Sequence, residues 1–96
     1  MRPVLLAYER DQDLAAIETL LQSRGHRILK AHTGLEALEM ARQETPHAVV
    51  SDVLLPLLDG FSLCRRLKED PVLRHLPVFL LSFRIEGPKY EAFAAE

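Results

Sequence analysis

The chain has very little cysteine and no long apolar run, and each of these absences excludes a class of protein. Its 96 residues include one Cys, no Trp and four Gly. The single thiol, Cys64, cannot form a disulfide within the chain, so a reducing, cytoplasmic location is expected. No apolar stretch approaches the ~20 residues needed to span a bilayer, and no signal peptide is visible. We therefore expect no membrane association.

The chain also lacks a marked excess of charge of either sign. Twelve basic and 14 acidic residues give a formal net charge of −2 at pH 7. Because these charges are spread along the chain, nothing electrostatic favours nucleic acid, and no direct nucleic-acid binding is expected. The hydrophobic content of 48% is enough to fill one core in a chain of this length. One domain, spanning residues 1–96, is predicted.

What is present is an alternation of strand-like and helix-like segments. Apolar runs with Val, Ile and Leu predict strands, and apolar residues at helical spacing between Gly and Pro breaks predict helices. The predicted strands are residues 4–8, 27–31, 48–52 and 78–82, and the predicted helices are residues 13–24, 33–44, 59–70 and 87–96. Strands that alternate with helices in this way favour a parallel sheet covered on both faces.

The apolar pattern also predicts the core and two helix caps. Thr33 and Asp59 stand where an N-cap is needed, at the starts of the second and third helices. Inward helical stripes and doubly covered strands identify the residues expected to be buried. These are Leu14, Ile17, Leu38, Val49, Val50, Leu67 and Leu80, with Phe61, Leu63 and Cys64 also turned inward on the third helix.

Polar residues follow three of the predicted strands and should meet at one rim of the sheet. They are Glu9, Arg10 and Asp11 after the first strand, Asp52 at the end of the third and Ser82 at the end of the fourth. Ligands of open α/β sheets bind at the carboxyl ends of such strands. From its position alone, Asp52 is a nucleophile, a metal ligand or a loop cap.

The segment Asp52-Val53-Leu54-Leu55-Pro56-Leu57-Leu58-Asp59-Gly60, together with the acids after the first strand and the Leu81-Ser82 end of the fourth, resembles the receiver domain of bacterial two-component response regulators. The resemblance implies an α/β, flavodoxin-like, doubly wound parallel sheet with strand order 2-1-3-4-5. Here the fifth strand and the last helix are expected to be missing, so the order becomes 2-1-3-4 and the domain is expected to be C-terminally incomplete. The residues 78–81 would then form an unpaired apolar edge.

The resemblance further implies a signalling phosphoprotein and not an enzyme. Asp52 matches the residue that accepts a phosphoryl group from a histidine kinase or phosphotransfer protein. Mg²⁺ would be held by Glu9, by Asp52 and by the backbone carbonyl of Leu54. Ser82 matches the hydroxyl that would bind a phosphoryl oxygen and so switch a protein interaction.

This chain departs from the family pattern at the pair of acids that binds the metal, which falls on Glu9 and Arg10, or on Tyr8 and Glu9 if the alignment shifts by one residue. A cation at this place should weaken or abolish Mg²⁺ binding. Arg10 could pair with Asp52 or Glu9 and substitute for the metal, or it could be a solvated side chain, with Asp11 supplying the missing acid. Lys89 stands too early in the chain to be the family's rim lysine. The alternative function is therefore a degenerate receiver, a protein-interaction module that works without phosphorylation.

Other functions find little support in the sequence. His26, His32, His47 and His75 have no spacing typical of a zinc site, and no zinc is expected. Neither a P-loop nor a dinucleotide fingerprint is present. A small flavodoxin-like cofactor binder stays as a third hypothesis, and a homodimer is left open.

Overall fold

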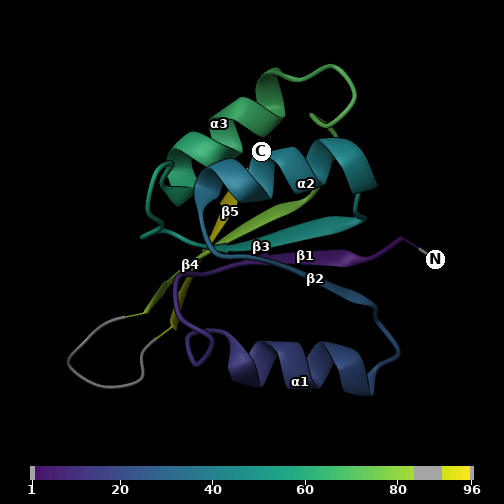
Figure 1. The fold of residues 1–96 in the computed structure, drawn as a ribbon, viewed down its shortest axis with the longest axis vertical. Coiled ribbons are helices and arrows are strands. Elements are labelled where there is room, and N and C mark those ends of the chain that lie inside the picture. Colours follow the sequence, from purple (N-terminus) through teal and green to yellow (C-terminus); the bar gives the residue numbers. More distant parts are fainter. Residues whose placement is uncertain (1, 84–89, 96) are drawn as a thin grey trace.

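A five-stranded sheet lies in the middle of the molecule, with helices on both of its faces (Figure 1). The computed structural model describes residues 2–83 and 90–95. The elements are β1 Val4–Ala7, α1 Ala15–Ser23, β2 Ile28–Ala31, α2 Gly34–Glu44, β3 Ala48–Asp52, α3 Gly60–Glu69, β4 Val78–Phe83 and β5 Tyr90–Ala95. Within the described residues, no helix is long and apolar enough to cross a membrane.

The strand order is β2-β1-β3-β4-β5, and the first four strands are parallel. This confirms the predicted α/β sheet with order 2-1-3-4. Parallel strands joined by helices end at one rim, which lies on the left of Figure 1. In the register of the sheet, Asp52 of β3 stands beside Leu81 of β4, and Ala7 of β1 stands beside Ser51. The ends of β1, β3 and β4 therefore carry the candidate site.

The prediction of a missing fifth strand was wrong, as was the helix predicted to run to the chain end. β5 pairs with β4 in antiparallel register, from Val78 opposite Ala95 to Phe83 opposite Tyr90. Alanine and glutamate favour a helix locally, but an open β4 edge would leave a row of backbone N–H and C=O groups unpaired. Pairing with β5 satisfies those groups. Gly87-Pro88, where the helix was expected to begin, lies outside the described residues.

The two faces of the sheet are covered unequally. The larger core cluster lies under α2 and α3, and the smaller one lies under α1 alone. Five of the residues predicted to be buried are confirmed, and these are Leu14, Leu38, Val49, Leu67 and Leu80. Ile17 and Val50 are only partly buried because α1, which has no fully buried residue, covers only part of its face. Phe61 is exposed and not inward as predicted.

Two capped helices fix the loops that surround the rim. Thr33 Oγ1 accepts a hydrogen bond from the amide of Glu36 at 3.0 Å, and Asp59 Oδ1 accepts one from the amide of Ser62 at 2.8 Å. Both predicted caps are thus confirmed. Helix α1 begins at Ala15, two residues later than predicted, so Asp13 belongs to the turn that precedes it.

Candidate functional site

Asp52 is a buried carboxylate at the carboxyl end of β3. It is 7% exposed, and its Oδ1 accepts a hydrogen bond from the amide of Leu54 at 3.0 Å. The chain turns closely around it, because a Cβ added to Gly60 would lie 2.5 Å from the Asp52 carbonyl oxygen. Glycine at position 60 therefore lets the start of α3 approach the end of β3 and fixes the loop between them.

Burial raises the pKa of Asp52 above its ordinary value, and the charges of Asp13 and Glu9 raise it further. The Leu54 amide and the Arg10 guanidinium act in the opposite direction. Burial is the largest of these effects, so the desolvation of the carboxylate outweighs its one backbone hydrogen bond. The charged form of Asp52 therefore destabilises the folded protein.

We expect Asp52→Asn to stabilise the protein at pH 7 by about 1 kcal/mol. A raised pKa means that the folded state binds the Asp52 proton more tightly than the unfolded state does. Charged Asp52 therefore lowers stability at neutral pH, and this loss disappears as the pH falls through the folded-state pKa. Urea unfolding of both proteins between pH 7 and pH 4 should show the advantage of the variant shrinking on acidification. An advantage that is independent of pH would contradict this assignment.

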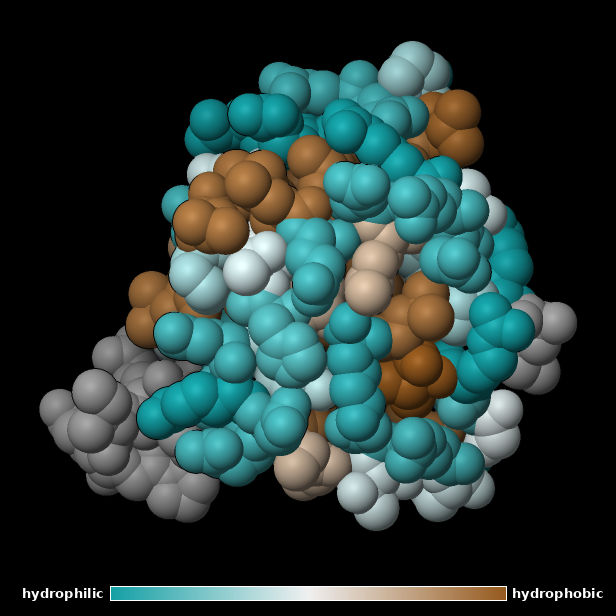
Figure 2. Space-filling view, viewed as in Figure 1, coloured by the Kyte–Doolittle hydropathy of each residue, from teal (hydrophilic) through white to brown (hydrophobic). Residues whose placement is uncertain are grey.

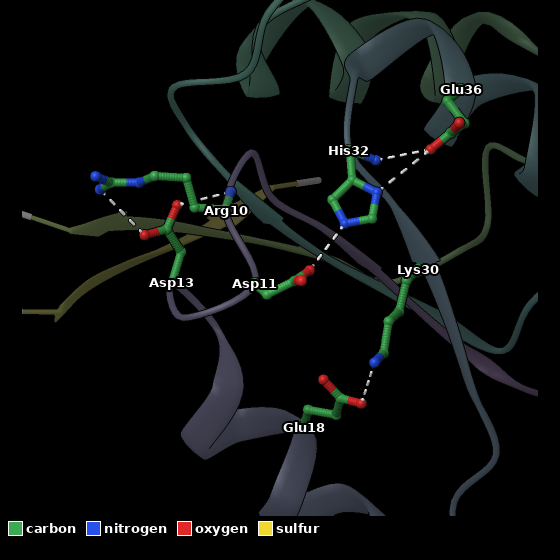
Figure 3. A network of polar contacts seen from close by, with 7 residues as sticks. All are labelled: Arg10, Asp11, Asp13, Glu18, Lys30, His32 and Glu36. Carbon is green, nitrogen blue, oxygen red and sulfur yellow. Dashed lines mark hydrogen bonds and ion pairs between the residues drawn. The ribbon is translucent and has the colours of Figure 1, made fainter.

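Arg10 contacts Asp13 and not Asp52. Its backbone amide donates to Asp13 Oδ2 and its Nη2 donates to Asp13 Oδ1, both at 3.2 Å, as Figure 3 shows. The Asp13 side chain is 6% exposed, whereas that of Arg10 is 61% exposed. Among the described residues, Arg10 makes no ion pair with Asp52 or Glu9, so its charge acts on Asp52 only through space.

The other acids of the rim point elsewhere. Asp11 contacts Nε2 of His32 at 3.1 Å, and Glu36 Oε1 accepts the His32 backbone amide at 2.8 Å (Figure 3). The His32 ring in turn packs edge-on against the buried ring of Tyr8. Asp11 thus links the loop after β1 to the residue that follows β2. Glu9 is exposed.

These residues fit a divalent cation poorly. Mg²⁺ prefers carboxylate, carbonyl and water oxygens in octahedral arrangement. In the part of the chain that the structure describes, no three carboxylate, imidazole or thiolate groups lie close enough to hold a metal ion. Both Asp13 oxygens already accept hydrogen bonds from Arg10, and the place of a second acid is taken by a cation.

The remaining predicted residues lie around the same rim. Ser82 is half-buried and follows Leu81, whose carbonyl accepts the amide of Val53 at 2.8 Å. Leu54 lies beside Asp52, with its amide, and not its side chain, directed at the carboxylate. Lys89 lies outside the described residues.

Sequence reasoning missed Asp13 and His32. Asp13 follows Arg10 by three residues, the spacing at which the acid of a capping box reaches back to accept a backbone amide. That spacing could have identified Asp13 from the sequence. Nothing in the sequence could have identified His32, because its contact partner, Asp11, lies 21 positions away.

The parallel sheet, with a buried aspartate at the end of its central strand, has the architecture of a flavodoxin-like domain. The chain matches the response regulator receiver domain family over residues 4–95, and it belongs to that family.

Two similar response regulators are much longer than this chain. The chain is 34% identical over 79 residues to the response regulator PleD of Caulobacter vibrioides, which covers 82% of this chain and 17% of PleD. It is 39% identical over 83 residues to the transcriptional regulatory protein AfsQ1 of Streptomyces coelicolor, which covers 85% of this chain and 36% of AfsQ1. The chain therefore spans much less than two thirds of these relatives.

Solved structures show the same fold. The signal receiver domain of a histidine kinase from Syntrophus aciditrophicus has a TM-score of 0.80 and 31% identity, over 88% of this chain and 64% of that one. The receiver domain of sensor histidine kinase PA1611 from Pseudomonas aeruginosa has a TM-score of 0.76 and 28% identity, over 82% of this chain and 65% of that one. In that structure a magnesium ion is coordinated in the active-site cleft.

Proposed function

We propose that this domain accepts a phosphoryl group on Asp52 from a histidine kinase or phosphotransfer protein, and thereby switches a protein interaction in a two-component phosphorelay. The observation that carries this proposal is the Asp52 carboxylate at the end of β3, with Oδ1 held by the Leu54 amide at 3.0 Å. That hydrogen bond orients the carboxylate and leaves Oδ2 as the attacking oxygen.

In the proposed reaction, an Asp52 oxygen attacks the phosphorus of a phosphohistidine on the donor protein. The P–O bond forms as the P–N bond breaks, and the leaving imidazole keeps the electron pair and takes a proton from solvent. The acyl phosphate adds negative charge beside Asp13 and Glu9, which already raise the pKa of Asp52. The hydroxyl of Ser82, on the neighbouring strand, is proposed to donate to a phosphoryl oxygen and so convert the new charge into a movement of the rim.

The metal is proposed to contribute less here than in the PA1611 receiver. Glu9, Asp52 and the Leu54 carbonyl are the residues that would ligate Mg²⁺, and Arg10 stands where a second acid would be expected. The positive charge of Arg10 lowers the pKa of Asp52 through space, as a bound cation would. We propose that Arg10 supplies part of that charge permanently.

Treatment with acetyl phosphate, with and without Mg²⁺, tests the proposal. The unmodified protein should gain one phosphoryl group in its intact mass, and Asp52→Asn should gain none. Asp59→Asn is the matched control, because Asp59 is exposed and only caps α3. It should be labelled like the unmodified protein. Labelling that survives in Asp52→Asn would assign the acceptor to another residue.

A degenerate receiver is the second candidate function, and the Arg10 pair with Asp13 favours it. If the rim never accepts phosphate, the domain acts as an interaction module in one fixed state. The same experiment separates the two functions: absence of labelling of the folded protein by any small phosphoryl donor, at any Mg²⁺ concentration, would support the degenerate receiver.

A further inference from the structure

An exposed apolar patch lies beside Asp52, and the proposed phosphotransfer makes no use of it. We define the rim patch as Leu35 at the start of α2, Leu54 and Leu57 in the loop between β3 and α3, and Phe61 at the start of α3. Figure 2 shows apolar side chains gathered on the side of the molecule where Figure 1 places the N-terminal ends of α2 and α3. The patch is therefore one surface built from three segments.

Backbone contacts hold these segments together. The amide of Gly34, next to Leu35, donates to the Pro56 carbonyl at 3.2 Å. The amide of Gly60, next to Phe61, donates to the Val53 carbonyl at 2.9 Å. The side chains of the patch are thus presented on a loop that is tied at both ends, which lowers the entropy lost when a partner binds them.

Leu57 has a strained backbone and an exposed side chain. Its φ of 69° lies in the left-handed region, which costs a leucine about 1–2 kcal/mol and costs glycine almost nothing. The side chain is 75% exposed, so packing within the chain returns little of that cost. Because the fold does not compensate this strain, it indicates that the Leu57 side chain contacts another molecule.

Two exposed residues of opposite charge, Glu39 and Arg65, stand beside the patch, one on each helix. Glu39 follows Leu35 by one helical turn, and Arg65 follows Phe61 by one turn, so each charge lies on the same helix side as its apolar neighbour. Both charged residues are exposed, and neither forms an ion pair with any described residue. A two-fold axis parallel to the helices would place α2 against α3 of the other copy, with acid facing base.

We propose that the rim patch binds the rim patch of a second copy of this chain, forming a two-fold symmetric dimer in which Glu39 of each copy faces Arg65 of the other. The formal net charge of −2 gives little repulsion between copies. Four side chains make an interface smaller than the usual ~800 Å² per partner, so we expect the dimer to be weak.

Sedimentation equilibrium from about 10 µM to about 1 mM covers the expected transition. The mean mass of the unmodified protein should rise towards that of a dimer. Leu57→Gly should weaken association at least about tenfold, because it removes a central apolar side chain. The same change suits the left-handed backbone, so its melting temperature should be unchanged or raised. Loss of association therefore cannot be ascribed to unfolding.

Matched variants test the place and the symmetry of the interface. Leu54→Gln should weaken association, whereas Val72→Gln should not, although the two side chains are 69% and 73% exposed. Glu39→Arg should weaken the dimer, and adding Arg65→Glu should restore it. Three results would overturn the proposal: a monomer at every concentration, a dimer that Leu57→Gly leaves intact, or equal losses in the Leu54 and Val72 variants.

Discussion

Replacing Arg10 with aspartate is expected to raise the affinity of the rim for Mg²⁺ by at least about two powers of ten. A guanidinium about 5 Å from a divalent cation repels it by roughly 7 kcal/mol at an effective dielectric near 20. The Arg10 side chain is 61% exposed, so solvent screening removes about half of that, and roughly 3 kcal/mol still exceeds a hundredfold. The variant also releases Asp13 from its ion pair, which adds a second oxygen donor near Asp52.

Calorimetric or NMR titration of the folded proteins with Mg²⁺ measures this change. Arg10→Gln should give a smaller gain, because it removes the cation without adding an acid. Arg24→Asp makes the same change in net charge at the far end of α1 and should leave the affinity unchanged. Tight binding by the unmodified protein, with no gain in Arg10→Asp, would show that Arg10 does not oppose the metal.

Gly34→Ala is expected to destabilise the fold by at least about 3 kcal/mol, although alanine is the better helix former. A Cβ at position 34 would overlap the backbone carbonyl of Leu58. This carbonyl group is part of the backbone and cannot rotate out of the way as a side chain would, so α2 and the loop before α3 would have to separate. That separation would break the hydrogen bond from Gly34 to Pro56 and loosen the loop that follows Asp52.

Gly25→Ala is the control for Gly34→Ala. Gly25 has a φ of 85° with no atom within 4 Å of the added Cβ, so its substitution should cost only the backbone strain, about 1–2 kcal/mol. Urea unfolding of the three proteins gives the comparison. A Gly34→Ala protein as stable as the unmodified one would contradict the close approach of α2 to the loop.

The sequence was sufficient for those parts of the fold that local pattern determines. Unbroken apolar runs predicted three of the four parallel strands, since strands covered on both faces need no polar alternation. The alternation of polar and apolar residues at 27–31 predicted the remaining one, β2, as an edge strand. Thr33 and Asp59 predicted two helix starts, because a cap binds amides only two or three residues away. These same features predicted that Asp52 ends a buried strand.

Features that depend on tertiary contacts could not be predicted from the sequence. Residues 90–95 carry helix-forming alanine and glutamate, yet the β4 edge pairs with them as a strand. Arg10 had several acids within reach, and the start of α1 decided that Asp13 would be its partner. Phe61 fits a helical stripe, but it lies on the flank of α3 beside the loop and stays exposed.

The thin covering of one sheet face has a dynamic consequence. Helix α1 contributes no fully buried residue, so it should open by sub-global unfolding at a lower free energy than α2 or α3. Asp13 lies in the turn that leads into α1, and it holds Arg10. When α1 detaches, the guanidinium loses its anchor and the charge beside Asp52 is no longer fixed in place. The position of the Arg10 charge beside Asp52 therefore depends on the helix that we expect to unfold most easily.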